Sequence, residues 1–467
     1  MSRQLDLALI AANRFGLGAR PGELKDIAHA PRDWVLAQLE TPPLPSDALA
    51  ALPSSLDYQK QMVEWREQVK SAGDSNDMAD QPLKFGERFR DNMLAEINLR
   101  ATLQCDTQNP VAERLVMFWS NHFALSNEKR PLQLMAGTLE REVLREGMLA
   151  DFGSLLIAAE QHPAMLLYLD NQQSTGPDSP VAMRRARQKA GGRKNDINEN
   201  LAREILELHT LSSDGGYDQD DIIALAQGIT GWRPWIAARK GTPMGTHGSR
   251  FAIGYHEPGA RQFLGEHFAQ KGVAQGEAML ARLAKDPNTG RFISEKLCRH
   301  FVSDTPPAEL VHTLSRIYQK SDGDLKAVYQ ALFKSDLAWQ TDTRKFRRPD
   351  EYLIAIHRGL DTRPIAKQTG RWRREMHLMG QDAFRPGSPA GWPDTASQWI
   401  GADAIWKRLF IAQRYSSRLP RERDAMELAR DTLGPSLGDA TAVAISEASN
   451  RRQATALVLA SPEFQWR

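Results

Sequence analysis

Carboxylates, amides, an arginine and a histidine are concentrated between Asp196 and Leu211, in the stretch DINENLAREILELHTL. Apolar residues recur there at three- and four-residue spacing, which predicts an amphipathic helix. At about 100° per residue, Asn200, Glu204 and Glu207 fall on one narrow arc, and leucine and isoleucine side chains fill the opposite side. No other part of the sequence gathers as many groups that could take part in chemistry.

The spacing of Glu204 and Glu207 suits acid–base chemistry. Two carboxylates at this spacing lie on one helix face, where they can act as acid and base, bind a metal or accept hydrogen bonds from sugar hydroxyls. Arg203 would keep one carboxylate ionised while burial raised the pKa of the other, and an acid–base pair requires that difference. Glu199, Arg203 and Glu207 are also spaced as i,i+4 ion pairs, so the alternative is an ordinary solvated ladder.

Other polar and aromatic side chains occur in turns or where helical patterns end. Asp170 ends MLLYLD, His122 follows the aromatic residues of FWSNHF, and Trp232 and His256 lie in GWRPW and HEPG. Aromatic residues in such loops can be platforms for sugar rings or anchors of the core. The alternatives for the others are a salt-bridge partner, a hydrogen-bonded core histidine and a turn residue.

We predict a cleft that brings these groups together, with Trp232 and His256 at its rim. The predicted catalytic residues are Glu207 as general acid and Glu204 or Asp170 as base or nucleophile. The predicted substrate-binding residues are His122, Asn198, Asn200, Arg203, His209, Trp232 and His256.

The elements that must position these groups are mostly helices. Ala, Leu, Glu, Arg and Gln dominate, apolar residues recur at helical spacing, and β-branched residues rarely cluster. The sequence predicts a mainly all-α fold, a single large helical domain over residues 1–467, and a small β-hairpin around residues 241–265. Residues near 72–83 and 171–195 have the composition of flexible loops. The second is rich in basic residues and could instead be a lid that binds an anionic group.

Overall charge and composition exclude several classes of protein. Of 467 residues, 60 are Lys or Arg and 58 are Asp or Glu, so the formal net charge of +2 predicts neither a nucleic-acid nor a membrane partner. No apolar run is long enough to span a bilayer. The N-terminal stretch lacks an export signal, which predicts a cytoplasmic protein, or a periplasmic one if a signal has been removed. Cys105 and Cys298 lie in helical patterns, as buried thiols do.

Several familiar catalytic motifs are missing. The sequence contains no phosphate-binding glycine loop and no HExxH helix, which argues against nucleotide hydrolases and zincin proteases. Metal sites in helix bundles commonly use Glu-x-x-His, whereas this chain has Glu207-Leu-His209. We therefore predict no metal and no cofactor.

Motifs along almost the whole chain resemble those of one bacterial family. In order, the chain contains NRFGLGARPGE, ERLVMFWSNHFALS, MLLYLDNQQS, NENLAREILELHTL, GGYDQDDIIALAQGITGW, HEPGARQFLG, RFISEKLCRHFV, SPAGWPD and LASPEFQWR. It resembles the domain-of-unknown-function 1800 family, whose members are often secreted and encoded beside sulfatase-like proteins. The resemblance implies no general activity. Members commonly have His-Asn-His in FWxNHF, whereas this chain has Ser120, which weakens any metal role that needs both histidines.

The residues favour a hydrolase with paired carboxylates, in particular a glycoside hydrolase acting on a bacterial polysaccharide, so a carbohydrate or other polymeric substrate is expected. One alternative is a non-catalytic binding or assembly partner of an exported enzyme, which should expose a large apolar patch and lack a cleft carboxylate with a raised pKa. Another is a metal-dependent enzyme that uses His122, His209 and the carboxylates.

Overall fold

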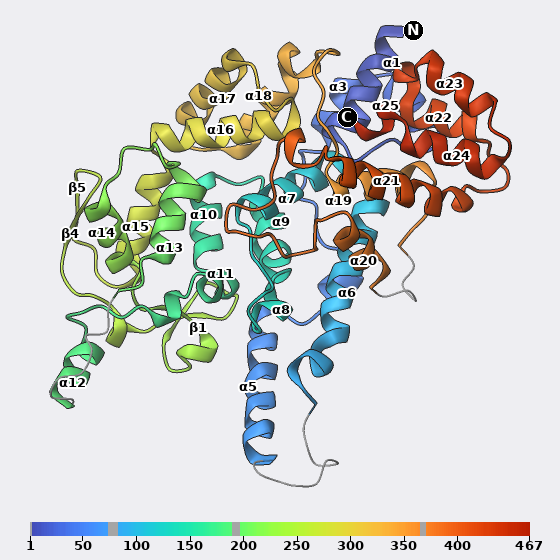
Figure 1. Cartoon of the computed structure of the whole chain (residues 1–467). Helices are drawn as coiled ribbons and strands as arrows, with labels where there is room; N and C mark the ends of the chain where they lie inside the picture. Colours follow the sequence, from blue (N-terminus) through green and yellow to red (C-terminus); the bar gives the residue numbers. More distant parts are fainter. Residues whose placement is uncertain (1, 73–82, 189–196, 365–369) are drawn as a thin grey trace.

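Helices dominate the computed structural model, which describes residues 2–72, 83–188, 197–364 and 370–467 (Figure 1). The prediction of a mainly all-α fold is confirmed. A three-stranded antiparallel sheet has the order β1–β3–β2, and a second sheet pairs β4 with β5. The strands are β1 (Trp232–Pro234), β2 (Thr242–Met244), β3 (Ser249–Phe251), β4 (Arg261–Phe263) and β5 (Glu266–Phe268).

The first half of the chain forms helices of very different lengths. They are α1 (Ser2–Leu9), α2 (Glu23–Ile27), α3 (Pro31–Ala37), α4 (Asp47–Ala50), α5 (Ser55–Ala72), α6 (Phe85–Asp106), α7 (Pro110–His122), α8 (Leu132–Met135), α9 (Arg145–Gly147), α10 (Phe152–Glu160), α11 (Pro163–Tyr168), α12 (Pro180–Gln188), α13 (Asn200–Glu204) and α14 (Gln219–Gly228). Wider, π-helical turns are η1 (Ile10–Phe15), η2 (Glu140–Leu144) and η4 (Ile205–Thr210).

The second half of the chain is also helical. Its helices are α15 (Val273–Ala284), α16 (Pro287–Phe301), α17 (Ala308–Lys320), α18 (Leu325–Lys334), α19 (Pro349–Gly359), α20 (Arg371–Leu378), α21 (Ala402–Tyr415), α22 (Ala425–Leu433), α23 (Asp439–Ser446), α24 (Arg451–Ala460) and α25 (Pro462–Gln465). Within the described ranges, no helix is both long and apolar enough to cross a membrane.

Helix starts follow local sequence signals. Proline occupies the first turn of α3, α7 and α11, where its missing N–H has no intrahelical partner to lose. Asp218 caps α14 by accepting hydrogen bonds from the N–H groups of Asp220 and Asp221.

The predicted loop at 171–195 is partly wrong, because residues Pro180–Gln188 form α12. Its remainder from 189, like residues 73–82 of the other predicted loop, lies outside the described residues.

Two hydrophobic cores hold these helices together. One core includes residues between Ala8 and Trp339, and the other is built mainly from residues between Tyr352 and Phe464. Helices α6 and α7 contribute to both, since one end of α6 packs in the first core and the other end in the second. In Figure 1 these two helices lie between the α16–α18 layer and the C-terminal helices α21–α25. Both free cysteines are buried, as predicted.

Candidate functional site

The stretch that carries the predicted catalytic residues is α13 followed directly by the π-helical turn η4. The N–H of Leu211 donates to the carbonyl of Leu206 at 3.0 Å, five residues back instead of four. This wider turn changes the directions of Glu207 and His209 from those of an ideal helix. The apolar side of the segment is buried at Leu201 and Ile205, so the polar side faces outward. Single π-helical turns occur often at functional sites.

Glu204 has the environment expected of a proton donor. Its side chain is half-buried, and burial raises the pKa of its carboxyl, an effect that the nearby charge of Glu207 increases. His209 and Arg203 oppose the shift without cancelling it. Among the described residues, none donates a hydrogen bond to Glu204, and Arg203 directs its N–H groups to Glu207 and Glu199 instead. The carboxyl therefore faces neighbours that do not stabilise its charge strongly.

Glu207 lies in a different environment on the same turn. The Arg203 Nη1 is 3.5 Å from Glu207 Oε1, and the Arg203 Nη2 is 3.0 Å from Glu199 Oε2. The i,i+4 ladder anticipated from the sequence therefore exists. Burial and the adjacent Glu207 carboxylate raise the pKa of the Tyr217 hydroxyl, which places that hydroxyl beside Glu207. The two glutamates of the turn thus differ, because only Glu207 lies at ion-pair distance from Arg203.

The end of α11 lies next to this turn. Burial and the charges of Glu204 and Glu128 raise the pKa of Tyr168 to about 12, which places its phenol near Glu204. Asp170 has a left-handed backbone, with φ 59°, and its carboxylate lies 2.6 Å from the Lys129 Nζ. Asn198 donates to the Asp170 carbonyl at 3.3 Å. The structure therefore brings Asp170 and Asn198 together at one side of the turn.

Two predicted binding histidines lie behind the turn, out of contact with solvent. The His209 Nδ1 is 2.7 Å from Glu160 Oε1, and both side chains are buried. The His122 Nε2 donates to the His209 carbonyl at 3.2 Å, while its Nδ1 accepts from the Lys296 Nζ at 2.9 Å. Burial and Lys296 hold the pKa of His122 well below its ordinary value. Both histidines are buried, so they do not present a face to a substrate.

Lys296, on α16, is a further polar group of this region. Burial lowers the pKa of its ammonium to about 8, and Asp394 opposes that shift. Its Nζ donates to His122, and it feels the charge of Asp394 in the GWPD loop, residues 391–394. On the same helix, α16, His300 is fully buried.

Trp232 and His256 are buried, so they do not form the exposed rim that the sequence predicted. Trp232 has no exposed surface, and its ring fills the space beside Gly276. The His256 Nδ1 bonds the Thr230 carbonyl at 3.0 Å inside a turn, where burial lowers its pKa. Asn200 is exposed and only begins the helix. Both buried residues are structural because the chain closes over them from distant segments.

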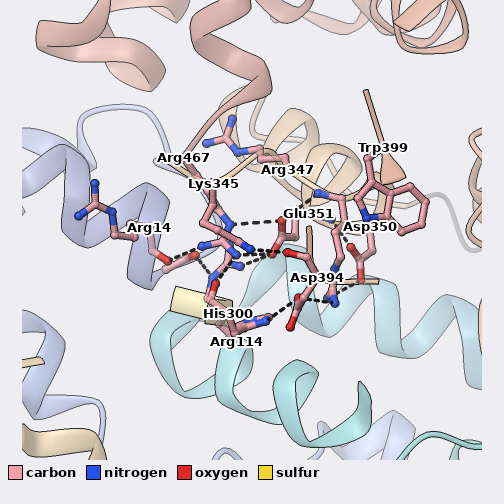
Figure 2. Close-up of polar contacts among 12 residues, drawn as sticks. Arg14, Arg114, His300, Lys345, Arg347, Asp350, Glu351, Asp394, Trp399 and Arg467 are labelled. Atoms are coloured by element: carbon pink, nitrogen blue, oxygen red, sulfur yellow. Dashed lines mark hydrogen bonds and ion pairs between the residues drawn. The ribbon is translucent and has the colours of Figure 1, made fainter. Parts of the chain in front are cut away.

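A second polar cluster, which the sequence did not reveal, lies between the two hydrophobic cores. Figure 2 shows Arg114 and Arg467 converging on Glu351, with an ion pair to Arg114 and an Nη2–Oε1 distance of 3.0 Å to Arg467. Burial alone would raise the pKa of Glu351, but these arginines hold it well below its usual range. The His300 Nδ1 lies 3.3 Å from Asp394 Oδ1 in the same cluster. The only local signal was the capping pattern of α19, in which Glu351 accepts from the Arg348 N–H.

Ser120 and His122 face different surroundings although both lie at the end of α7. Ser120 lines a cavity of about 60 Å³ with Arg100, Glu140 and Arg348, and its hydroxyl bonds the Glu140 carboxylate. His122 points to the opposite side, as residues two apart on a helix do. In the described part of the chain, no three His, Cys, Asp or Glu side chains are grouped so that they could hold a metal ion.

The site therefore consists of Glu204 and Glu207 on one turn, Tyr168 and Asp170 beside it, and a buried row of basic and acidic groups behind it. Such an arrangement can donate a proton from one carboxyl while the neighbouring carboxylate remains ion-paired.

Comparison with curated proteins gives no match, and comparison with solved structures gives none either. Residues 10–466 match the family described as Protein of unknown function (DUF1800), and the chain belongs to that family.

Proposed function

We propose that this protein is a hydrolase that cleaves a glycosidic bond of a polysaccharide, with the carboxyls of Glu204 and Glu207 as its acid–base pair. The observation that carries the proposal is the difference between the two groups. Burial raises the pKa of Glu204, whereas Glu207 is ion-paired with Arg203 at 3.5 Å. Glycoside hydrolysis uses two carboxyl groups whose environments differ in this way.

In the proposed reaction, the protonated Glu204 gives its proton to the glycosidic oxygen as the bond between that oxygen and the anomeric carbon breaks. The carboxylate of Glu207 stabilises the positive charge that develops on the sugar ring. A water molecule then bonds to the anomeric carbon through its oxygen and returns a proton to Glu204. This assignment exchanges the roles expected from the sequence, where Glu207 was the acid. Asp170, held by Lys129 at 2.6 Å, would accept hydrogen bonds from sugar hydroxyls.

The test is replacement of each carboxylate in turn. Glu204→Gln and Glu207→Gln should each lower turnover by about 10²–10⁴-fold, because each removes a group that acts in the transition state. Release of reducing ends from a panel of purified bacterial polysaccharides measures turnover. Glu199→Gln is the matched control, since Glu199 is bound to the same arginine at 3.0 Å but lies outside the proposed pair. It should keep wild-type turnover.

Unchanged turnover in folded Glu204→Gln protein, or no release from any polysaccharide by the wild type, would overturn this assignment. The assembly-partner alternative would then gain weight, because α21 presents apolar side chains to solvent. Trp406, Leu409 and Phe410 are 69%, 40% and 49% exposed, at a spacing that places them on one helix face.

A further inference from the structure

A cavity of about 320 Å³ lies where the two ends of the chain meet. Its walls come from α1 and η1, from residues 341–344, from the turn after α22 and from the last residues of the chain. Figure 1 shows α1 and α25 side by side, with both chain ends marked next to them. Two family motifs, NRFGLG and EFQWR, thus form one cavity, and neither takes part in the proposed hydrolysis. Its volume is in the range of small-molecule sites.

Arg14 brings a buried positive charge to this cavity. Its side chain is 3% exposed, and its guanidinium donates to the carbonyls of Ala338 at 2.7 Å and Thr343 at 2.5 Å. No carboxylate of the described residues lies within ion-pair distance of it, and its Nε has no hydrogen-bond partner there. Figure 2 shows the Arg14 guanidinium pointing away from the network around Glu351. Burial and Arg467 lower its pKa to about 10, and the charge of Asp342 partly opposes that shift.

Two further arginines line the same cavity. Arg344 is exposed there, and Arg467 is buried and shares the single carboxylate of Glu351 with Arg114. The acids of the lining do not balance these charges. The lining holds two carboxylates, those of Asp6 and Glu463, against three guanidinium groups. Glu463 accepts hydrogen bonds from the Thr441 hydroxyl and from a backbone N–H. The cavity therefore has an excess of guanidinium groups.

We propose that this cavity binds an oxyanion, either phosphate or the phosphate or carboxylate group of a small molecule. Guanidinium groups bind oxyanions through paired N–H donors, and a bound anion would neutralise the buried charge of Arg14. Arg344 provides the accessible donors, and Arg14 and Arg467 provide charge beneath them. The site is separate from Glu204, so it stands or falls independently of the proposed hydrolysis.

Isothermal titration calorimetry of the full chain with inorganic phosphate, and separately with acetate, tests the proposal. One of the two anions should bind the wild type saturably at one site, and whichever binds identifies the chemistry. Arg344→Gln should weaken that binding about tenfold or more, since it removes a charge-assisted hydrogen bond. Arg3→Gln, an exposed arginine of α1 that does not line the cavity, should bind as the wild type does.

Arg14→Lys keeps a positive charge but loses the guanidinium, so it should also bind more weakly while remaining folded. Glu204→Gln should bind with wild-type affinity, which separates this site from the catalytic proposal. The proposal is wrong if neither anion binds the wild type saturably, or if both Arg344→Gln and Arg14→Lys bind with unchanged affinity.

Discussion

Glu204 and Glu207 show how one helical turn can give two identical side chains different chemistry. They are three residues apart, yet only Glu207 lies at ion-pair distance from Arg203, while Glu204 is half-buried near the charges of His209 and Glu160. Desolvation disfavours the charged form of Glu204 and raises its pKa. This difference is local and can be tested through the residue that controls it.

Arg203→Gln should move the alkaline limb of the pH–rate profile to higher pH by a few tenths of a unit to about one unit. The reason is that Arg203 lowers the pKa of Glu204, so its loss leaves burial and the charge of Glu207 less opposed. Because the acid form is active, activity is present below the pKa of Glu204 and is lost as the pH rises through it. The profile of polysaccharide hydrolysis from pH 4 to 9 measures the shift.

Arg203→Lys retains the charge and is the matched variant, so its limb should stay close to that of the wild type. A limb that moves to lower pH in Arg203→Gln, or that moves equally in both variants, would contradict the assignment of Glu204 as the acid.

Side-chain spacing predicted this part of the site because its groups are neighbours in sequence. Helical geometry was enough to predict that Glu204 and Glu207 share one arc. Asp170 could be placed near them because it ends a preceding helix. Burial of Trp232 could not be predicted in the same way, because the residue that covers its ring, Gly276, is far along the chain. Glu160 and Asp394 were missed for the same reason, since their partners come from other helices.

At the scale of elements, the site depends on how loops and turns attach to α7. The GWPD loop binds the end of this helix through Asn121, whose side chain accepts from the Trp392 N–H at 2.7 Å and donates to the Trp392 carbonyl at 2.9 Å. Lys345 donates to the carbonyl of Asp394 and holds the other end of the loop. The docking of this loop on FWSNHF could not be predicted, because the two segments are far apart in the sequence.

Gly391→Ala should destabilise the protein by about 2 kcal/mol or more, because it combines a left-handed backbone with a clash. Gly391 has φ +81°, and a Cβ there would lie 2.4 Å from the Asn121 carbonyl oxygen. Urea unfolding followed by tryptophan fluorescence measures the loss. Gly387→Ala lies in the same loop with nothing within 4 Å of its Cβ, so its effect should stay within about 1 kcal/mol. Equal stabilities of the two variants would contradict this account of the docking.

At the scale of the whole molecule, a polar layer joins two hydrophobic cores. Glu351 is 1% exposed and is shared by Arg114 and Arg467, which come from α7 and from the end of the chain. His300 and Asp394 extend the layer toward Lys296 and hence toward the candidate site. Removing one partner of such a network leaves the others buried without compensation, and that loss typically exceeds the net stabilisation by the intact pair.

Glu351→Gln should therefore lower the free energy of unfolding by about 3–5 kcal/mol near neutral pH. The network also makes stability depend on pH. The folded-state pKa of Glu351 is held below its ordinary value, so its contribution is fully present above about pH 5 and is lost as the pH falls toward the folded-state pKa. Urea unfolding from pH 7 down to pH 3 should show the wild type losing stability steeply and Glu351→Gln much less so. Glu64→Gln, at an exposed position of α5, should follow the wild-type curve. If Glu351→Gln loses less than about 1 kcal/mol, or keeps the wild-type slope, the polar layer does not join the two cores as described.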